Sequence, residues 1–219
     1  MAKRAILFVN GEVERYDFLE PLITNKDYLV AVDGGLRHLE LLARQPHLLI
    51  GDLDSITTSQ LKLMTYKKVE ICKFPVEKNE TDLELALLEV VKRGIDEILI
   101  IGALGGRLDQ TLANLFLLLL PELSGKSVRL LTHNEEILLV TKMTVIDGNP
   151  GDVISLIPLK GDAVGVTTLG LKFPLHEETL LAEHSRGISN SMLSRRAEIE
   201  VKDGYLLLIH SNTKLEENL

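Results

Sequence analysis

Hydrophobic positions divide the chain into two parts with different patterns. In the first part, short runs of aliphatic and β-branched residues alternate with segments in which apolar residues recur at helical spacing. The runs predicted as strands are 4–9, 28–32, 47–50, 69–74, 97–101 and 128–131. Strands that alternate with helices in this way predict a parallel sheet in an α/β domain.

The segments between these strands predict helices in different environments. Apolar spacing predicts helices near 36–43 and 83–91, and the second of these ends at Gly94. A third helix is expected around 59–66. The segment 108–120 is apolar on several faces, which predicts a buried helix.

From about residue 142 the pattern changes to short alternating runs broken by glycines, with no convincing helix. This pattern predicts an all-β domain. Two runs on either side of Asp203-Gly204 predict a hairpin with a two-residue turn. The expected organisation is therefore an α/β domain over residues 1–141 and an all-β domain over residues 142–219.

Composition narrows the classes of partner. The net charge is −8, the chain has no Trp and aromatic residues make up 4%, so it has neither the basic surface nor the stacking rings of a nucleic-acid-binding protein. No apolar run approaches the roughly 20 residues of a membrane-spanning helix. A single cysteine, Cys72, cannot form an internal disulfide and indicates a reducing compartment. We therefore expect a cytoplasmic protein without nucleic-acid or membrane partners.

Aspartates stand shortly after most of the predicted strands. They are Asp33, Asp52, Asp54, Asp82 and Asp109. Because the carboxyl ends of parallel strands form the ligand crevice of an open α/β sheet, all five are expected to face it. Each of them could instead cap a helix or begin a turn.

Asp52 and Asp54 are separated by one residue. In an extended segment their carboxylates would point the same way and could share a hard cation, for which Mg²⁺ is the natural candidate. The alternative is a turn in which Asp54 caps the helix around 59–66. Asp82 could complete the metal site from the first turn of its helix, while Lys78 could meet a phosphate. Here too capping is an alternative, with Asn79 or Thr81 at the N-cap.

Two glycine-rich turns connect predicted strands to helices. Asp33-Gly34-Gly35 is one, and the segment 102–109, with Gly105, Gly106 and Arg107, is the other. Glycines let backbone N–H groups approach an anion closely, so both turns are candidate phosphate cradles. The planar fork of Arg107 suits a phosphate, and an exposed or Asp-paired arginine is the alternative. In the all-β part, the polar loop 185–191 could orient a neutral polar ligand.

Taken together, the motifs resemble those of thiamine pyrophosphokinases along nearly the whole chain. The matching motifs are Ala31-Val32-Asp33-Gly34-Gly35, Gly51-Asp52-Leu53-Asp54-Ser55, Thr81-Asp82, Gly105-Gly106-Arg107-Leu108-Asp109-Gln110 with Asn114, and Gly187-Ile188-Ser189-Asn190. The resemblance implies an α/β catalytic domain, a C-terminal β-sandwich that binds thiamine, and a homodimer with its sites near the subunit interface. It also implies transfer of a pyrophosphoryl group from ATP to the thiamine hydroxyl, giving thiamine pyrophosphate and AMP.

The resemblance also assigns roles to individual residues. Asp52, Asp54 and Asp82 would hold Mg²⁺ on the ATP phosphates, and Ser189 and Asn190 would contact thiamine. The residues that would line the nucleotide and transfer site are Asp33, Gly34, Gly35, Lys78, Thr81, Gly105, Arg107, Asp109 and Gln110. Aromatic residues are scarce, and Phe173 is a candidate for stacking on thiamine.

Two other functions remain open at this stage. One is a pyrophosphokinase that acts on a pterin alcohol, which would keep the carboxylates but alter the region of Ser189 and Asn190. The other is a non-catalytic nucleotide-binding regulator, which should lose one of the three metal-binding aspartates. All three are present, which favours an enzyme.

Overall fold

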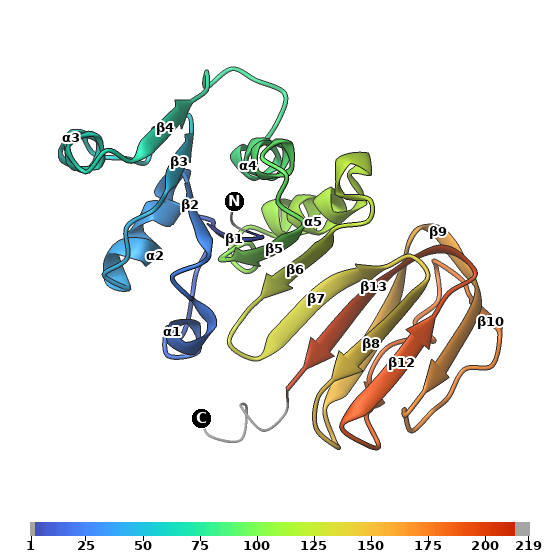
Figure 1. Cartoon of the computed structure of the whole chain (residues 1–219). Helices are drawn as coiled ribbons and strands as arrows, with labels where there is room; N and C mark the ends of the chain where they lie inside the picture. Colours follow the sequence, from blue (N-terminus) through green and yellow to red (C-terminus); the bar gives the residue numbers. More distant parts are fainter. Residues whose placement is uncertain (1–2, 213–219) are drawn as a thin grey trace. The chain divides into compact units, whose positions relative to one another are not determined.

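A computed structural model describes residues 3–212, and the chain divides into two units between residues 133 and 134 (Figure 1). The first unit contains one sheet in the order β4-β3-β2-β1-β5-β6, and every neighbouring pair is parallel. Its strands are β1 (Arg4–Phe8), β2 (Tyr28–Val32), β3 (Leu48–Gly51), β4 (Glu70–Lys73), β5 (Glu97–Ile101) and β6 (Ser127–Leu131). The predicted parallel α/β sheet is confirmed.

Helices connect the strands and cover both faces of this sheet. They are α1 (Leu19–Leu22), α2 (Leu36–Leu41), α3 (Thr58–Tyr66), α4 (Asp82–Lys92) and α5 (Leu108–Phe116), with 3₁₀ turns η1 (Asp33–Gly35), η2 (Leu117–Leu119) and η3 (Pro121–Leu123). Figure 1 shows α1 and α2 on one face and α4 and α5 on the other. The chain leaves β1 towards β4 and returns to β5 on the opposite side of β1. Ligands of open α/β sheets bind at such a reversal, outside the carboxyl ends of the strands.

The predicted burial of the helix at 108–120 is wrong. The helix exists as α5, but none of its residues is buried. Leu108, Leu112 and Phe116 share one face at i, i+4 and i+8 and are 71%, 47% and 53% exposed. An apolar helix pattern shows that a face is hydrophobic but not how much of the fold covers it.

The second unit is built from strands. They are β7 (Glu135–Val140), β8 (Met143–Asp147), β9 (Val153–Leu169), β10 (Glu178–Leu180), β11 (Asn190–Ser191), β12 (Arg196–Glu200) and β13 (Asp203–Ser211). One end of the 17-residue β9 pairs with β13, which in turn pairs with β7, and the other end pairs with β12, which pairs with β8. Buried aliphatic residues of these strands form one core. The all-β prediction is confirmed for the described residues of this unit.

The predicted hairpin around Asp203-Gly204 is wrong. β12 pairs with β8 and β9, whereas β13 pairs with β7 and β9, so the two runs enter different ladders. Asp203 and Gly204 already belong to β13, and the pairing with β9 shifts register between Asp203 and Tyr205. Gly204 has φ +93°, and a side chain there would overlap the carbonyl oxygen of Asp162. The Asp-Gly pair therefore makes a bulge inside a strand.

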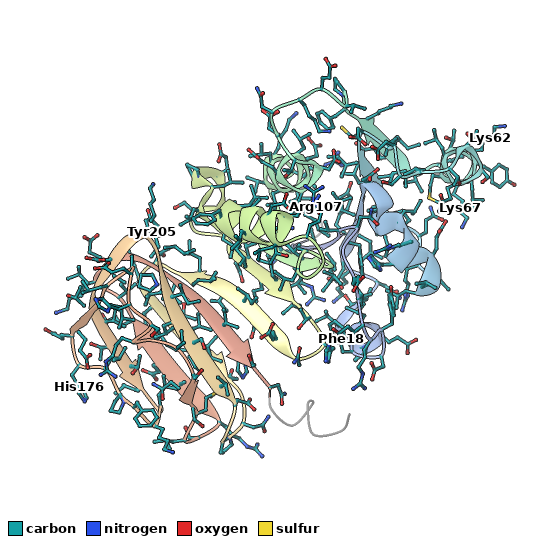
Figure 2. The ribbon with its side chains drawn as sticks, turned by 180° about the vertical axis from the view of Figure 1, so that it is seen from behind. Phe18, Lys62, Lys67, Arg107, His176 and Tyr205 are labelled. Atoms are coloured by element: carbon teal, nitrogen blue, oxygen red, sulfur yellow. The ribbon has the colours of Figure 1, made fainter. Side chains whose placement is uncertain are left out.

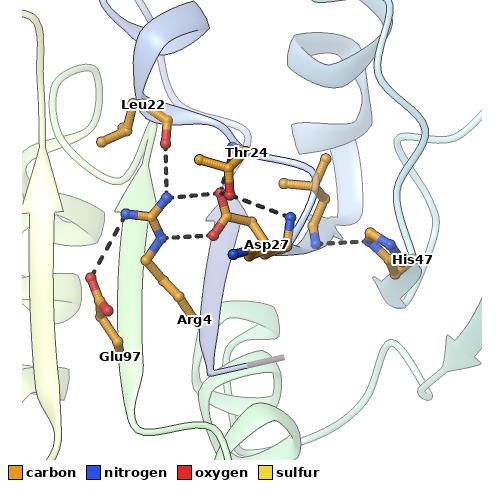
Figure 3. Close-up of polar contacts among 8 residues, drawn as sticks. Arg4, Leu22, Thr24, Asp27, His47 and Glu97 are labelled. Carbon is orange, nitrogen blue, oxygen red and sulfur yellow. Dashed lines mark hydrogen bonds and ion pairs between the residues drawn. The ribbon is translucent and has the colours of Figure 1, made fainter. Parts of the chain in front are cut away.

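At the opposite, amino-terminal edge of the first sheet, a charged cluster ties three segments together (Figure 3). Arg4 donates from Nε and Nη2 to the two carboxylate oxygens of Asp27, each at 2.8 Å, and from Nη2 to the Leu22 carbonyl. Thr24 donates its backbone N–H to Asp27 at 2.6 Å, and Glu97 lies 3.8 Å from Arg4. Both carboxylate oxygens of Asp27 accept charge-assisted hydrogen bonds from Arg4, so the cluster stabilises the start of β1 and β2.

Two ionisable side chains lie in the core of the second unit. Asp152 is fully buried, and its Oδ2 accepts hydrogen bonds from the Asn149 backbone N–H at 2.8 Å and from His210 Nε2 at 3.0 Å. Glu136 lies on the other side of the ring, 3.9 Å from Nδ1. Interaction with Glu136, and then with Asp152, raises the pKa of His210 although burial opposes it. The imidazolium is therefore stabilised in the folded state.

This arrangement predicts a pH dependence of stability. Because the pKa of His210 is raised by folding, its contribution is complete below the unfolded value of about 6.5 and is lost as the pH rises through the folded pKa. We expect the free energy of unfolding of the parent to fall more between pH 6.5 and pH 9 than that of His210→Gln. Denaturant titrations at several pH values measure this, with the exposed His176→Gln as the control. Parallel curves for parent and His210→Gln would contradict the assignment.

Within residues 3–212, no helix is both long enough and apolar enough to cross a bilayer.

Candidate active site

Three carboxylates meet at the carboxyl edge of the parallel sheet. Asp33 follows β2, Asp52 follows β3, and Asp82 is the first residue of α4 after β4. One oxygen from each carboxylate lies within 4.8 Å of the other two. We call these three residues the carboxylate group. Three of the five aspartates predicted at this edge therefore converge on one point.

Asp33 is the most enclosed member of the carboxylate group. Its side chain is buried, and among the described residues its Oδ1 has no hydrogen-bond partner. Its backbone has φ +45°, which is unusual for a residue other than glycine. A buried, unpaired carboxylate oxygen is costly unless something binds it, so this atom is a candidate ligand for a cation.

Lys78 supplies the positive charge at the carboxylate group. Its Nζ lies 3.0 Å from Asp82 Oδ1 and 3.4 Å from Asp52 Oδ2. A hydrogen bond from the Asp54 backbone N–H, followed by the charge of Lys78, lowers the pKa of Asp52. Burial raises the pKa of Asp82, and the charges of Asp52 and Asp33 add to this while Lys78 opposes it. The group therefore carries excess negative charge that one lysine only partly balances.

Gly51 lets the three carboxylates approach one another. Its φ is +146°, a conformation that L side chains rarely adopt. A Cβ atom at this position would lie 3.1 Å from Asp33 Cβ and 3.3 Å from Asp82 Cγ. The last residue of β3 must therefore be glycine for the carboxylate group to form.

Asp54 lies outside the carboxylate group. Leu53 has φ +66°, so the segment is a turn and the predicted extended arrangement of Asp52 and Asp54 is wrong. Asp54 is exposed, and its backbone N–H donates to Asp52 Oδ1 at 3.1 Å. Asp54 does not cap α3 either. That cap is Thr57, which forms a reciprocal capping box with Gln60.

The two glycine-rich turns differ in how open they are. Gly34 and Gly35 are buried: a side chain at Gly34 would overlap Asn10, and one at Gly35 would overlap the Phe8 carbonyl oxygen. Gly105 and Gly106 are exposed, have φ +82° and +66°, and have no atom within 4 Å of the space a Cβ would take. The first turn therefore needs glycine for packing, and only the second offers open backbone to an anion.

Helix α5 holds the open turn in place. Thr111 Oγ1 donates to the Gly105 carbonyl at 3.2 Å, and Asn114 Nδ2 donates to the Ala103 carbonyl at 2.7 Å. Both side chains come from the first two turns of α5, so the helix fixes the loop that precedes it. A fixed loop loses less entropy when it binds a ligand.

Arg107 and Asp109 pair with each other at the start of α5. Arg107 donates from Nε at 3.1 Å and from Nη2 at 2.6 Å to the two carboxylate oxygens of Asp109. Both side chains are exposed, and Figure 2 shows Arg107 at the end of α5. Gln110 is also exposed, and its backbone N–H donates to Asp109 at 2.9 Å. The structure thus shows the Asp-paired arginine that the sequence left open as an alternative.

Thr81 is the N-cap of α4. Its Oγ1 accepts a hydrogen bond from the Glu84 backbone N–H at 3.2 Å, as one of the two capping alternatives predicted. The cap orients the first turn of the helix, and so sets the position of Asp82.

In the second unit, Ser189 directly precedes β11, and Asn190 is the first residue of that strand. Ser189 is exposed, has φ +57°, and donates its backbone N–H to Ser155 Oγ at 3.1 Å. Asn190 Oδ1 accepts from the Phe173 backbone N–H at 3.0 Å, and Asn190 Nδ2 donates to the Phe173 carbonyl at 2.7 Å. The hydroxyl of Ser189 is thus open to a ligand, whereas the amide of Asn190 is engaged within the protein.

Comparison with known proteins gives the same result for both halves of the chain. Residues 19–130 match the family model "Thiamin pyrophosphokinase, catalytic domain", and residues 142–206 match "Thiamin pyrophosphokinase, vitamin B1 binding domain". The chain belongs to the thiamin pyrophosphokinase family.

Individual members of the family agree with this. Thiamine pyrophosphokinase of Bacillus subtilis (strain 168) is 29% identical over 163 residues, which are 74% of this chain and 76% of that protein. A crystal structure of thiamine pyrophosphokinase from Bacillus subtilis superposes with a TM-score of 0.85 and 26% identity, covering 96% of this chain and 99% of the other. A thiamin pyrophosphokinase family protein from Enterococcus faecalis gives 0.81 and 25%, covering 95% and 99%.

Family membership confirms the fold class and the activity expected from the sequence. The chain is an enzyme that transfers a pyrophosphoryl group from ATP to thiamine, giving thiamine pyrophosphate and AMP. The carboxylate group lies within the residues that match the catalytic domain, and Ser189 and Asn190 lie within those that match the vitamin B1 binding domain.

Sequence reasoning missed the loop that follows β1. The Asn10 side chain packs against Gly34, next to Asp33. Arg37 Nη2 donates to the carbonyl oxygens of Asn10 and Gly11, at 2.9 and 2.8 Å, and holds this loop at the carboxyl edge. The argument used for the aspartates, that polar residues directly after parallel strands face the crevice, applies equally to Asn10.

Proposed function

We propose that the two half-sites of this pyrophosphokinase lie in different units, with the ATP phosphates at the carboxylate group and thiamine at the Ser189 loop. The observation that carries the phosphate half is the convergence of Asp33, Asp52 and Asp82, two of which have a buried oxygen without a hydrogen-bond partner among the described residues. We retain residues 1–141 and 142–219 as the functional division of the chain.

The carboxylate group fits Mg²⁺. Hard cations prefer carboxylate oxygens, and Mg²⁺ in nucleotide sites is commonly held by one or two carboxylates together with the phosphates. Asp52 and Asp82 are the predicted ligands that the structure brings together, and Asp33 Oδ1 is a further candidate. Asp54 stays a predicted ligand whose carboxylate lies outside the group. When bound, the metal would neutralise charge on the transferring pyrophosphoryl group.

Protein groups would position the nucleotide and the acceptor for in-line transfer. The thiamine hydroxyl attacks the β-phosphorus, the bond from that phosphorus to the oxygen of AMP breaks, and the hydroxyl proton passes to a site carboxylate. Phosphoryl transfer depends mainly on positioning and electrostatics rather than on covalent chemistry by the protein. Lys78, next to Asp52 and Asp82, is placed to donate to a phosphate. Thr81, Asp109 and Gln110 stay predicted nucleotide contacts.

The Gly105-Gly106 turn and Arg107 form the other side of the proposed phosphate site. The turn has open backbone, and Arg107 is held only by an exposed pair with Asp109. Exposed ion pairs contribute little to stability, so a phosphate can replace Asp109 as the partner of Arg107.

Arg107→Lys tests this exchange. The change keeps the charge but removes the two-pronged donor, so we expect kcat/KM for ATP to fall by about tenfold with no change in stability. Steady-state kinetics with ATP varied at saturating thiamine measure the effect. Lys62→Arg, an exposed substitution on α3, is the control for a surface exchange of the same two residue types. Parental kinetics in Arg107→Lys would remove Arg107 from the site.

In the second unit, Ser189 and Phe173 are the proposed thiamine contacts. Ser189 presents an exposed hydroxyl, and Phe173 is 56% exposed. An aromatic ring supplies a stacking surface and a hydroxyl supplies a directional hydrogen bond, which together suit a flat polar ring system. Asn190 was predicted to contact thiamine as well, but its side-chain amide is hydrogen-bonded to the backbone of Phe173.

The assembly and the compartment are further parts of the proposal. A homodimer with thiamine sites near the subunit interface follows from the family resemblance. Mixing variants that are defective in different half-sites tests it. A cytoplasmic location agrees with the single cysteine, Cys72, which lies half-buried in β4.

Product analysis tests the activity itself. Purified protein with ATP, Mg²⁺ and thiamine should release AMP in a one-to-one ratio with thiamine pyrophosphate. ADP instead of AMP would mean transfer of a single phosphoryl group and would contradict the proposal. A pterin alcohol in place of thiamine is the matched control acceptor and should give no AMP above background.

A further inference from the structure

Asn190 makes three hydrogen bonds to the backbone. Its Oδ1 accepts from the Phe173 N–H at 3.0 Å and from the Ser191 N–H at 2.9 Å, and its Nδ2 donates to the Phe173 carbonyl at 2.7 Å. A carboxamide offers one oxygen with two acceptor positions and two N–H donors. Both acceptor positions and one donor are therefore used, which leaves a single N–H.

The residues before and after Phe173 are also hydrogen-bonded to neighbouring segments. Lys172 donates its backbone N–H to the Ser191 carbonyl at 2.8 Å, and Leu171 forms a bridge with Met192. On the other side, the Leu175 N–H donates to Thr168 Oγ1 at 2.9 Å. The backbone around Phe173 is thus tied to two neighbouring segments, while the residue is 56% exposed.

An exposed aromatic ring on an anchored backbone is typical of a binding contact. The chain contains five Phe, four Tyr and no Trp, so such rings are few. Fixing the backbone before binding reduces the entropy lost when the ring stacks on a ligand. The side chain that fixes it is Asn190, which comes from the loop of the other proposed thiamine contact, Ser189.

We propose that Asn190 is a positioning residue of the thiamine half-site, which holds the Phe173 ring in place for stacking and does not bind thiamine through its own amide. The proposal rests on the thiamine half-site proposed above. It changes the role expected for Asn190 from the sequence, and makes Phe173 and Asn190 one functional unit.

A double-mutant cycle tests whether Asn190 acts through Phe173. Phe173→Ala and Asn190→Ala are each expected to raise KM for thiamine about tenfold, with kcat and KM for ATP near parental values. If Asn190 acts only through Phe173, the double variant should be no worse than Phe173→Ala alone. Multiplied effects, or an unchanged KM in Asn190→Ala, would overturn the proposal. His176→Ala, an exposed truncation in the same connection, is the matched control (Figure 2).

A binding measurement tests the role of Asn190 separately from the proposed pyrophosphoryl transfer. Since the chain has no Trp, Phe173→Trp creates a single tryptophan at the proposed contact, which can be excited selectively over the four Tyr. Thiamine should quench its emission, and adding Asn190→Ala should weaken thiamine binding by a similar factor of about ten and lower the emission anisotropy of the free protein. Quenching with unchanged affinity and anisotropy in the Asn190→Ala background would overturn the role of Asn190 while leaving the thiamine site intact. Absence of AMP formation by the parent would instead overturn the proposed function.

Discussion

Asp82→Asn is expected to abolish pyrophosphoryl transfer while the protein stays folded. Asp82 is one of the three carboxylates whose oxygens lie within 4.8 Å of one another, and it also pairs with Lys78. Asn keeps the shape but removes the charge needed to hold Mg²⁺ and the phosphates, so we expect kcat to fall by a factor on the order of 10³. AMP release at saturating ATP, Mg²⁺ and thiamine measures this.

The stability of the same variant separates a ligand from a structural cap. Burial raises the pKa of Asp82, so its ionised form is disfavoured in the folded state at neutral pH. This penalty is absent below the unfolded pKa and develops as the pH rises through the folded pKa. Asp82→Asn should therefore leave the free energy of unfolding at pH 7 unchanged or slightly higher.

Glu80→Gln is the matched control, because it removes one charge from an exposed position in the segment that connects β4 to α4. It should retain parental activity. A large loss of stability in Asp82→Asn would support a capping role, and a folded, fully active Asp82→Asn would remove Asp82 from the proposed metal site. Direct titration of Mg²⁺ by calorimetry should show weaker binding to Asp82→Asn than to Glu80→Gln.

The sequence predicted most of the first unit because local and global signals agree there. The strands of a buried parallel sheet are nearly continuous aliphatic runs, so their positions could be found without knowledge of the fold. Once they are parallel, the residues that follow them must share an edge, and this placed Asp33, Asp52 and Asp82 together. Thr81 was one of two predicted N-caps, beside Asn79, since capping depends on nearby residues only.

The sequence could not predict features that depend on which distant segment packs against, or pairs with, a given segment. The apolar face of α5 is mostly exposed, because burial depends on what covers a helix. Asp203-Gly204 has the composition of a hairpin turn, but β9 provides partners for both β12 and β13 and converts it into a bulge. Asp54 is separated from Asp52 by the left-handed backbone of Leu53, a conformation that a leucine gives no reason to expect.

Long-range contacts also changed the interpretation of two site residues. Asp33 was expected to line the site, and the structure adds that its buried Oδ1 has no hydrogen-bond partner among the described residues and that Gly51 leaves space beside its side chain. Asn190 was expected to face thiamine because it is polar and lies in a loop. Its amide instead bonds the backbone of Phe173, 17 residues earlier in the chain. A polar loop residue can be recognised from sequence, but the direction of its hydrogen bonds cannot.

Mixing two variants that are each nearly inactive at thiamine concentrations well below the raised KM is expected to restore activity if the enzyme is a dimer whose site combines half-sites from two chains. Asp82→Asn has an intact thiamine half-site, and Phe173→Ala/Ser189→Ala has an intact phosphate half-site. In a mixed dimer, one hybrid site combines the two intact halves and the other combines the two defective ones. With equal amounts and random exchange, half of the dimers are mixed, so about a quarter of the parental activity should return.

Subunit exchange must be demonstrated independently, for example by energy transfer between differently labelled chains. Mixing Asp82→Asn with Asp52→Asn is the control, because both variants are defective in the same half-site and should stay inactive together. If exchange occurs and the first mixture also stays inactive, each site is formed within one chain.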